Sequence, residues 1–469
     1  MKNNAKSYRK IVAVSGIGQC VVARGCNGAS AEMTSPRPVA NLNIIRNRTH
    51  KASFRGSATG TALTLAFAVS VATLEFGFSA NANERKPAFT TFELYGEQVG
   101  HRSVAAAKAE AGRAALTSTA AGQIPRARAS GTFITFDAPG AIGGTEPTSI
   151  NNFGFITGSY FDNVGSGSHG FVRTREGTFV SFDVPGAVNG TFPSGINNFG
   201  FITGSYGDNL GSGFHGFVRT PYGTFVLFDV PVAAATVSVA INDEGAVTGW
   251  YFDVNFFQHT FLRAYNGALT TFDPPAAVYG STPSTITDLG VILGVYFDAD
   301  SRTHGFLRSP AGAFSEILGP GGATGQFDPF NLGAALSINF QGMIAGTYFA
   351  PIVGNPFGGN YTVFIRSKDG TYITFAAADY PPCCIWSAPS DINLAGTVTG
   401  SFNDGFTINH GFVRFRDGTL TTFDAPKAGT GFNQGTLPLA ITSEGVIMGL
   451  YRDPNNLSHG FLFSPRRDK

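Results

Sequence analysis

Short stretches in which apolar and polar residues alternate fill the chain from Gly131 onward. The segments "FITGSYFD" from Phe155 and "GTFVSFD" from Gly177 carry a period-2 alternation rich in aromatic and β-branched residues, which is the period of a β-strand. Between such segments stand "NNFG", "REG" and "RDG", whose Gly, Asn and Asp residues favour tight turns. The pattern predicts short antiparallel strands and leaves almost no room for helix.

The alternating segments recur as a repeat. The element "HGF[VL]" or a close variant begins at His169, His215, His259, His304, Thr362, His410 and His459. The element "TFxxFDxP" lies around Phe136, Phe182, Phe228, Phe272, Phe314, Phe375 and Phe423, and "IN" or "IT" stands at Ile150, Ile196, Ile241, Ile286, Ile338, Ile392 and Ile441. Each element thus has seven copies over residues 131–469, or about 48 residues per unit (339/7), a period typical of repeat folds.

Each unit is expected to form four antiparallel strands, which we call A ("SGIN"), B ("FITGSYFD"), C ("HGFVRT") and D ("TFVSFD"). Four-stranded units at this period predict the blades of a β-propeller, with an open β-solenoid as the alternative. The region starts on a lone D strand, "GTFITFDAP" from Gly131, and ends on a lone C strand, "HGFLFSP" from His459. We therefore predict a seven-bladed propeller over 131–469, closed by the N-terminal D strand joining the last unit.

The N-terminal part does not follow this pattern. Basic residues Arg46, Arg48, Lys51 and Arg55 precede an uncharged run, Gly56 to Leu74, and a small-residue stretch follows. This order predicts a leader and secretory signal peptide over 1–82, cleaved after Ala82, and hence an extracellular or periplasmic protein. An uncleaved membrane anchor is the alternative, although the apolar part is shorter than the ~20 residues of a typical span. Translation could also start at Met33, and the Ala-rich stretch 83–130 is predicted to be a linker.

Composition narrows the range of partners. The net charge of +1 with 13% charged residues gives no basic field for nucleic acid. A hydrophobic fraction of 43% is high enough for a folded core. We expect a monomer without a membrane span in the mature chain and without a cofactor.

The repeat carries a family resemblance. The pairing of "HGF[VL]R" with "S-x-IN-x-x-G-x-[IV]-x-G" resembles the HAF-repeat family, bacterial proteins predicted to be extracellular and named for a His-Ala-Phe triplet. The middle residue here is Gly or Thr and never Ala, so this chain would be a variant of the repeat. The resemblance spans residues 131–469 and implies secretion and a repeat fold, but no established activity.

Six of the eight histidines begin C strands, and an Asp precedes each by six or seven residues. These carboxylates are Asp162, Asp208, Asp253, Asp298, Asp404 and Asp453. Each Asp–His pair flanks its own B–C hairpin, so the pairs are spread over the repeat and offer too few ligands for a structural metal site. We expect a structural role, with Asp bracing its loop and His hydrogen-bonded to neighbouring backbone. Calcium remains an alternative, with Asp298, Asp300 and Ser301 as its most suggestive loop.

Candidate catalytic groups are few. Asp391 is the only carboxylate among the A strands, with Glu146 just outside them, whereas acid–base catalysis needs paired groups at the channel mouth. No nucleophile elbow, zinc-binding helix motif or phosphate-binding loop stands out. We expect a non-enzymatic protein, with a propeller lyase or hydrolase acting on polysaccharide as the alternative.

The loops point to recognition. The B–C loops and D–A connections should share one face, which we call the looped face, and the tight A–B and C–D turns should share the other. Loops on a rigid scaffold are where binding usually occurs. We expect an extracellular glycan or peptide to bind there, and the candidate residues are Phe192, Tyr279, Tyr380, Trp386 and Phe432.

We predict the binding groove at the irregular stretch "AADYPPCCIWSAPSD", with Tyr380 and Trp386 as apolar platforms for a sugar ring or an extended peptide. The alternative is that Trp386 packs under its own loop. Cys383 and Cys384 form either a vicinal disulfide or a pair of thiols in a packed loop. Cys20 and Cys26 precede the predicted cleavage site. A purely structural surface protein is the further alternative.

Overall fold

The computed structural model describes residues 128–163, 166–208, 213–320, 336–352, 355–377, 386–403 and 408–466. They all belong to one compact unit, Arg102–Lys469. The predicted leader, the predicted cleavage site and nearly all of the predicted linker lie outside the described residues.

All regular elements of the described residues are β-strands. In chain order they are β1 Gly131–Phe136, β2 Gly144–Ile150, β3 Ile156–Asn163, β4 Ser166–Arg173, β5 Phe179–Phe182, β6 Thr191–Ile196, β7 Ile202–Gly207, β8 Phe214–Arg219, β9 Phe225–Phe228, β10 Ala235–Ile241, β11 Val247–Phe252, β12 Gln258–Arg263, β13 Leu269–Phe272, β14 Ser281–Ile286, β15 Ile292–Phe297, β16 Thr303–Arg308, β17 Phe314–Ile317, β18 Ser337–Ile338, β19 Ile344–Ile352, β20 Asn355–Arg366, β21 Tyr372–Phe375, β22 Ser387–Ile392, β23 Val398–Asn403, β24 Asn409–Arg414, β25 Leu420–Phe423, β26 Gly435–Ile441, β27 Ile447–Arg452 and β28 Ser458–Pro465. The all-β prediction is confirmed. Within the part of the chain that the structure describes, no helix is long and apolar enough to cross a membrane.

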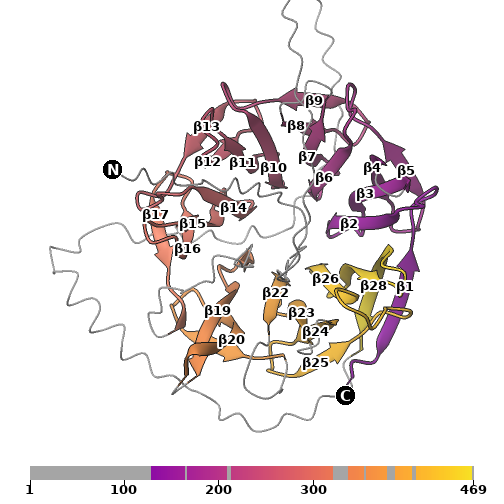
Figure 1. Cartoon of the computed structure of the whole chain (residues 1–469), viewed down its shortest axis with the longest axis vertical. Helices are drawn as coiled ribbons and strands as arrows, with labels where there is room; N and C mark the ends of the chain where they lie inside the picture. The colour runs from indigo at the N-terminus through magenta and orange to yellow at the C-terminus, as the bar shows by residue number, and fades with distance from the viewer. Residues whose placement is uncertain are drawn as a thin grey trace, which may run out of the picture. The chain divides into compact units, whose positions relative to one another are not determined.

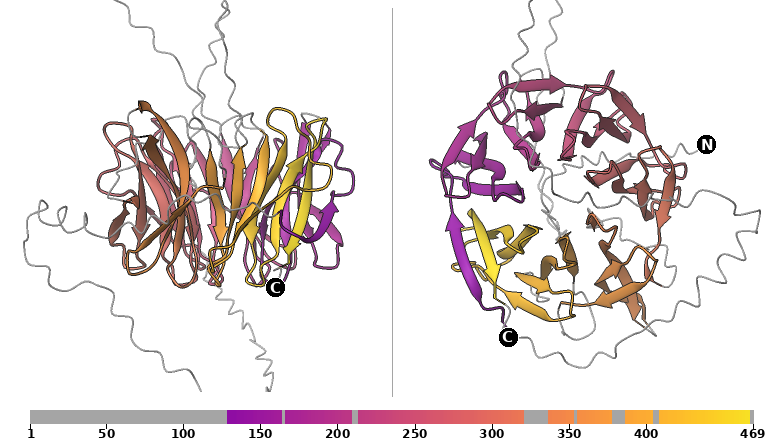
Figure 2. Two further views of the ribbon diagram at one scale, coloured as in Figure 1. Left: turned by 90° about the horizontal axis from the view of Figure 1, so that it is seen from below. Right: turned by 180° about the vertical axis from the view of Figure 1, so that it is seen from behind.

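The strands form repeated four-stranded antiparallel sheets in the predicted A-B-C-D order. Five sheets are separate: β2–β5, β6–β9, β10–β13, β14–β17 and β18–β21. The sixth contains β22–β25 together with β26–β28 and β1, joined by a single parallel bridge between Asn409 and Gly435. The sheets lie around a common centre, with the first strand of each innermost and the last outermost (Figure 1), and Figure 2 shows their strands edge-on.

The first strand pairs with the last, as the sequence predicts. β1 lies antiparallel to β28, in a register that runs from Gly131 opposite Pro465 to Phe136 opposite Gly460. The contact continues in the next sheet, because the Arg173 guanidinium lies 4.8 Å from the ring centre of Phe136. The two ends of the described region are therefore hydrogen-bonded to each other.

The core consists of aromatic side chains packed between sheets. The Phe of each "HGF" or "HTF" element is at most 1% exposed: Phe171, Phe217, Phe261, Phe306, Phe412 and Phe461. Strand B approaches strand A closely beside this ring. At Gly204, a Cβ atom would overlap the carbonyl oxygen of Phe192 and press on the ring of Phe217. The Gly of "TGSY" is thus required by packing rather than by turn geometry.

The Asn of the "IN" element joins neighbouring sheets, a role that the sequence did not reveal. The Asn197 side chain donates from Nδ2 to the carbonyl of Asn242 in the next sheet, at 2.9 Å. Its Oδ1 accepts the N–H groups of Phe199 and Phe201 in its own turn. The same inter-sheet bond is made by Asn151, Asn242 and Asn339, and Asn393 makes its equivalent within the sixth sheet, to the carbonyl of Thr442. Because these amides are mostly buried, each bond holds both a tight turn and an inter-sheet contact.

Candidate functional site

The topology gives the repeats two unlike ends. In an antiparallel A-B-C-D sheet, the A–B and C–D turns lie at one end, and the B–C loops and D–A connections lie at the other. The A–B and C–D turns follow one pattern, as in Asn197–Phe201 and Thr220–Thr224. The loops at the opposite end vary in length and sequence, and this end is the looped face predicted from the sequence.

Each histidine on the looped face contacts a carboxylate at the end of strand D. His169 Nδ1 lies 3.0 Å from both carboxylate oxygens of Asp183, and His304 Nδ1 lies 2.8 Å from Glu316 Oε1. Equivalent contacts join His215 to Asp229, His259 to Asp273, His410 to Asp424 and His459 to Asp137. We expected the histidines to bond backbone, so this expectation was wrong: Nδ1 contacts the Asp of the "FD" element because strands C and D are paired neighbours.

The predicted Asp partners lie on the other side of the imidazole. His304 Nε2 is 2.9 Å from Asp298 Oδ2, while the corresponding distances are 3.5 Å for His169 to Asp162 and 3.3 Å for His215 to Asp208. His259 and His459 lie 3.8 Å from Asp253 and 3.7 Å from Asp453, respectively. Asp404 lies outside the described residues.

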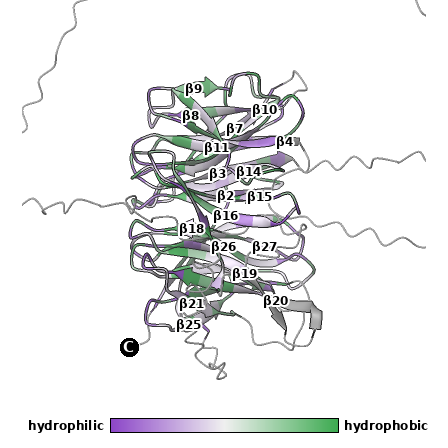
Figure 3. Ribbon diagram, turned by 90° about the vertical axis from the view of Figure 1, so that its left-hand side faces the viewer, coloured by the Kyte–Doolittle hydropathy of each residue, from purple (hydrophilic) through white to green (hydrophobic). Residues whose placement is uncertain are grey.

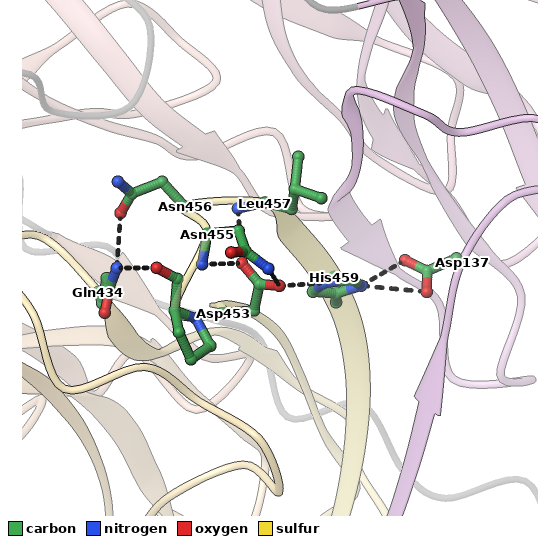
Figure 4. A network of polar contacts seen from close by, with 8 residues as sticks. Asp137, Gln434, Asp453, Asn455, Asn456, Leu457 and His459 are labelled. Atoms are coloured by element: carbon green, nitrogen blue, oxygen red, sulfur yellow. Dashed lines mark hydrogen bonds and ion pairs between the residues drawn. The ribbon is translucent and has the colours of Figure 1, made fainter.

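Figure 4 shows this arrangement around His459. Asp453 Oδ1 accepts the N–H groups of Asn455 and Leu457, at 2.8 and 2.9 Å, so the Asp braces its loop as expected. On the other side of the imidazole, His459 Nδ1 contacts Asp137, which is the residue that follows β1. The network therefore links the last B–C loop to the first strand of the described region.

Electrostatics and packing fit a structural role for these histidines. Burial lowers the pKa of His169, but the hydrogen bonds and charges of Asp183 and then Asp162 outweigh it, so the net pKa is raised. The ring also stacks against Tyr160 of strand B, with centroids 5.2 Å apart. Among the described residues, no group of three or more His, Cys, Asp or Glu side chains is arranged to hold a metal ion.

The two candidate catalytic carboxylates do not form a pair. Asp391 accepts from Ser337 Oγ at 2.7 Å and from the Ile441 N–H at 3.0 Å, and so bridges the strands on either side of its own. Desolvation raises the pKa of Asp391 despite these bonds. Glu146 instead accepts from Ser458 Oγ on β28, at 3.2 Å. The partners of Asp391 and the partner of Glu146 thus lie on different strands.

The four candidate binding residues that the structure describes are distributed over different parts of the chain. Tyr380 lies outside the described residues, as do Cys383 and Cys384. Phe192 is half-buried in β6 and packs edge-on against Phe214, with centroids 5.7 Å apart. Trp386 is half-buried and forms a β-bridge with Tyr361. Tyr279 and Phe432 are exposed in the loops before β14 and β26. Among the described residues, these side chains do not form one cluster.

A set of exposed apolar residues lies on three loops of the looped face, and Tyr279 belongs to it. We call it the three-loop patch, and its members with their exposed fractions are Val232 (87%), Val254 (70%), Phe256 (75%), Phe257 (49%), Val278 (52%) and Tyr279 (52%). The sequence analysis identified only Tyr279 among them. The signal that could have revealed part of the rest is "VNFF" from Val254 in a B–C loop, where the sister loops after Asp298 and Asp453 have "ADSR" and "PNNL".

Backbone contacts hold the three loops of the patch together. The β9–β10 loop is bonded to the start of the β11–β12 loop by Ala234 N–H to Phe252 O, at 2.8 Å. The end of the β11–β12 loop meets the β13–β14 loop, because a Cβ atom on Gly280 would overlap the carbonyl oxygen of Gln258. The chain enters the patch from β9, which is hydrophobic along its whole length (Figure 3). The patch is therefore a continuous stretch of the looped face.

Comparisons with known proteins show no family. No family model and no curated protein matches the chain. Among solved structures, virginiamycin B lyase from Staphylococcus aureus is similar at 13% identity and a TM-score of 0.44, covering 71% of this chain and all of that one. The β-propeller domain of the trilobed protease from Pyrococcus furiosus is similar at 9% identity and a TM-score of 0.46, covering 69% and 98%. The fucose-specific lectin from Aleuria aurantia has 10% identity and a TM-score of 0.35, covering 59% and 94%.

Proposed function

We propose that this chain is an exported, non-enzymatic binding module whose scaffold is a seven-bladed β-propeller, a variant of the HAF repeat. The seventh blade consists of β26, β27, β28 and β1. This proposal is supported by the β1–β28 pairing and by the single bridge that joins β24 to β26. The hydrogen bond from the Ser443 N–H to Asn152 Oδ1 also supports it, because it repeats, between the last and first A–B turns, a bond seen between adjacent sheets.

The module binds its extracellular ligand, a glycan or a peptide, on the looped face. The observation that carries this proposal is the three-loop patch, in which exposed apolar and aromatic side chains gather on loops anchored to paired strands. Exposed apolar patches on soluble proteins mark interaction sites, and aromatic side chains are common anchors of such sites. The mature chain acts outside the cytoplasm as a monomer, and its partners do not include nucleic acid.

The experiment is a glycan array and a peptide array probed with the full chain, with Tyr279→Ala and Trp386→Ala run beside the wild type. Binding that weakens by about 1 to 3 kcal/mol in Tyr279→Ala supports recognition at the patch, as expected for the loss of an aromatic anchor. Weakening in Trp386→Ala alone would move the site to the junction before β22. Absence of binding to both arrays would refute the binding function.

A polysaccharide lyase or hydrolase is the competing proposal, and it needs Asp391 or Glu146 to face a catalytic partner across the channel mouth. Their existing hydrogen bonds to Ser337, Ile441 and Ser458 favour the non-enzymatic alternative. A purely structural surface protein is the other competitor. Turnover of any polysaccharide by the wild type that disappears in Asp391→Asn or Glu146→Gln would establish the enzyme instead.

A further inference from the structure

Two residues of the three-loop patch have backbone conformations that do not suit their side chains. Phe256 has φ of 63° and Val232 has φ of 61°. This left-handed region is uncommon for residues other than Gly, Asn and Asp, and it is least suited to bulky or β-branched ones. Both positions recur in the repeat, so sister loops show what the backbone alone would select.

The turn that contains Phe256 has two sisters with the same hydrogen bonds. Phe256 N–H donates to the carbonyl of Asp253, as Ser301 N–H does to Asp298 and Asn456 N–H does to Asp453, each at 3.0 Å. The sister residues have the same conformation, with φ of 60° for Ser301 and 64° for Asn456. They carry small polar side chains, one of them the Asn that tolerates this region best. Phe256 is thus an unfavourable choice for this turn.

Val232 shows the same contrast in the D–A connection. Its turn closes with Ala233 N–H donating to the carbonyl of Val230, as Ala187 N–H does to Val184. Two sister connections have glycine at this position, Gly140 with φ of 84° and Gly186 with φ of 90°, and a third has the unbranched Lys427, with φ of 70°. Glycine adopts such angles without steric cost. The valine gains little from burial in return, because its side chain is 87% exposed.

Phe256 and Val232 combine an unfavourable backbone conformation with an exposed apolar side chain, and the stability of the fold does not explain this combination. Strained residues concentrate at ligand sites, where the surrounding structure holds them in place. Here two such residues lie in adjoining loops and belong to the same exposed patch. The side chains that are poor for stability are those that would face a partner.

The charges beside the patch define the chemistry of that partner. Asp253 begins the turn of Phe256, and Asp229, whose side chain is half-exposed, precedes the loop of Val232. The next B–C loop adds Asp298 and Asp300, with Arg302 paired to Asp300 at 3.3 Å. The N–H of Phe257 is the main cause of a lowered pKa at Asp253, so this carboxylate keeps its charge in mildly acidic medium. An apolar surface with an acidic edge complements a partner that is apolar and basic.

We infer that the three-loop patch binds an extended peptide segment whose apolar side chains are flanked by Lys or Arg. This inference rests on the proposed binding function and names its ligand. A glycan is the less suitable occupant, because the centre of the patch consists of Val and Phe side chains, with the Tyr279 hydroxyl as its polar group. Sugar recognition needs several placed hydrogen-bonding groups besides an aromatic platform.

The test replaces each strained residue with the residue of its sister loop. Phe256→Asn and Val232→Gly remove the apolar side chain while suiting the backbone, so the melting temperature should stay constant or rise by a few degrees. Tyr222→Asn is the matched control: Tyr222 is 96% exposed in a C–D turn at the opposite end, and Asn266 occupies its sister position. The full chain is used throughout.

A random library of displayed 12-residue peptides and a glycan array are screened with the wild type, and the selected compounds are measured by fluorescence anisotropy at low and high salt. We expect the selected peptides to be rich in apolar and basic residues. Their binding should be at least tenfold weaker in Phe256→Asn and in Val232→Gly, and unchanged in Tyr222→Asn. Binding to the wild type should weaken at high salt.

The failures of the inference and of the proposed function are distinguishable. Selected peptides that bind both variants as well as the wild type would remove the patch from the site but leave a binding module. Selection of glycans alone, lost in Phe256→Asn, would keep the site and overturn the peptide. A melting temperature several degrees lower in both variants would refute the strain argument. No ligand from either screen would overturn the inference and the proposed function together.

Discussion

Replacing Phe136 with alanine tests whether β1 completes the last blade. Phe136 ends β1 and is 8% exposed. Its ring covers Gly460 of β28, where a Cβ atom would overlap it, and it contacts the Arg173 guanidinium of the neighbouring sheet at 4.8 Å. The side chain thus ties the N-terminal strand both to its own sheet and to the next one. If this strand closes the ring, the whole propeller should lose stability when the ring of Phe136 is removed.

The expected loss is large. Deleting a buried Phe side chain typically costs about 3 to 5 kcal/mol, and the lost cation–π contact of about 0.5 to 1 kcal/mol overlaps with this figure. Two matched controls calibrate the result. Ile134→Ala removes a half-exposed side chain from the same strand and should cost at most about 1 kcal/mol. Phe182→Ala removes the equivalent ring of β5, which lies within one continuous sheet, and should cost within about 1 kcal/mol of Phe136→Ala.

The assay is equilibrium unfolding in urea, followed by far-ultraviolet circular dichroism and by tryptophan fluorescence. Trp250, one of the two tryptophans, is buried in β11, far along the chain from β1, so part of the fluorescence signal reports unfolding of a distant sheet. We expect both signals to shift together in Phe136→Ala with an unchanged m-value. A cost no larger than that of Ile134→Ala would show that β1 is a dispensable edge strand, and the closure argument would be refuted.

Three further predictions concern the repeat itself. Asn197→Ala should lower the free energy of unfolding by about 1 to 3 kcal/mol, measured in urea, because it removes the three hydrogen bonds that the Asn197 amide makes to backbone groups of two sheets. Gly204→Ala should lower it by at least about 1 to 3 kcal/mol, because the new Cβ overlaps the Phe192 carbonyl, and wild-type stability in this variant would contradict the packing argument. The raised pKa of His169 predicts that its contribution is complete below the unfolded pKa of about 6.5 and is lost as pH rises through the folded pKa. Asp183→Asn should therefore destabilise more at pH 5.5 than at pH 8, and thermal unfolding with an equal effect at both would contradict this sign.

The sequence predicted the strands well because the sequence of each strand type recurs in several units. Alternation and turn residues gave the A-B-C-D order, and a lone D strand at one end with a lone C strand at the other gave the β1–β28 pairing. What single positions do across sheets could not be read in the same way. The sequence marks Asn197 as a turn residue, yet its amide also bonds the next sheet. The residue recurs once per unit whether it bonds its own turn or the next sheet, so the repeat period does not distinguish the two roles.

The partner of each histidine was missed for a related reason. His169 and Asp183 are 14 residues apart. Asp162 is nearer to His169 in sequence, so the sequence analysis paired the histidine with Asp162. The antiparallel pairing of strands C and D brings His169 and Asp183 together. The two residues belong to separate repeat elements, "HGF[VL]" and "TFxxFDxP". The candidate binding site was anticipated only as a face. Apolar residues in a loop can be packed or exposed, and this difference depends on tertiary structure.

The repeats also show how a harmless departure differs from a functional one. In other sheets the N–H after the strand-D acid donates to a hydroxyl at the start of strand A, as Val184 does to Thr191 at 3.1 Å. Pro274 has no N–H to give, and there Ser281 Oγ donates to Asp273 instead, at 2.6 Å. That departure is compensated within the fold, so it needs no external explanation. Phe256 and Val232 have no such compensation, since their side chains are mostly exposed. A repeat protein contains its own controls in this sense. Under the proposed binding function, the uncompensated departures at Phe256 and Val232 mark the surface that faces the partner.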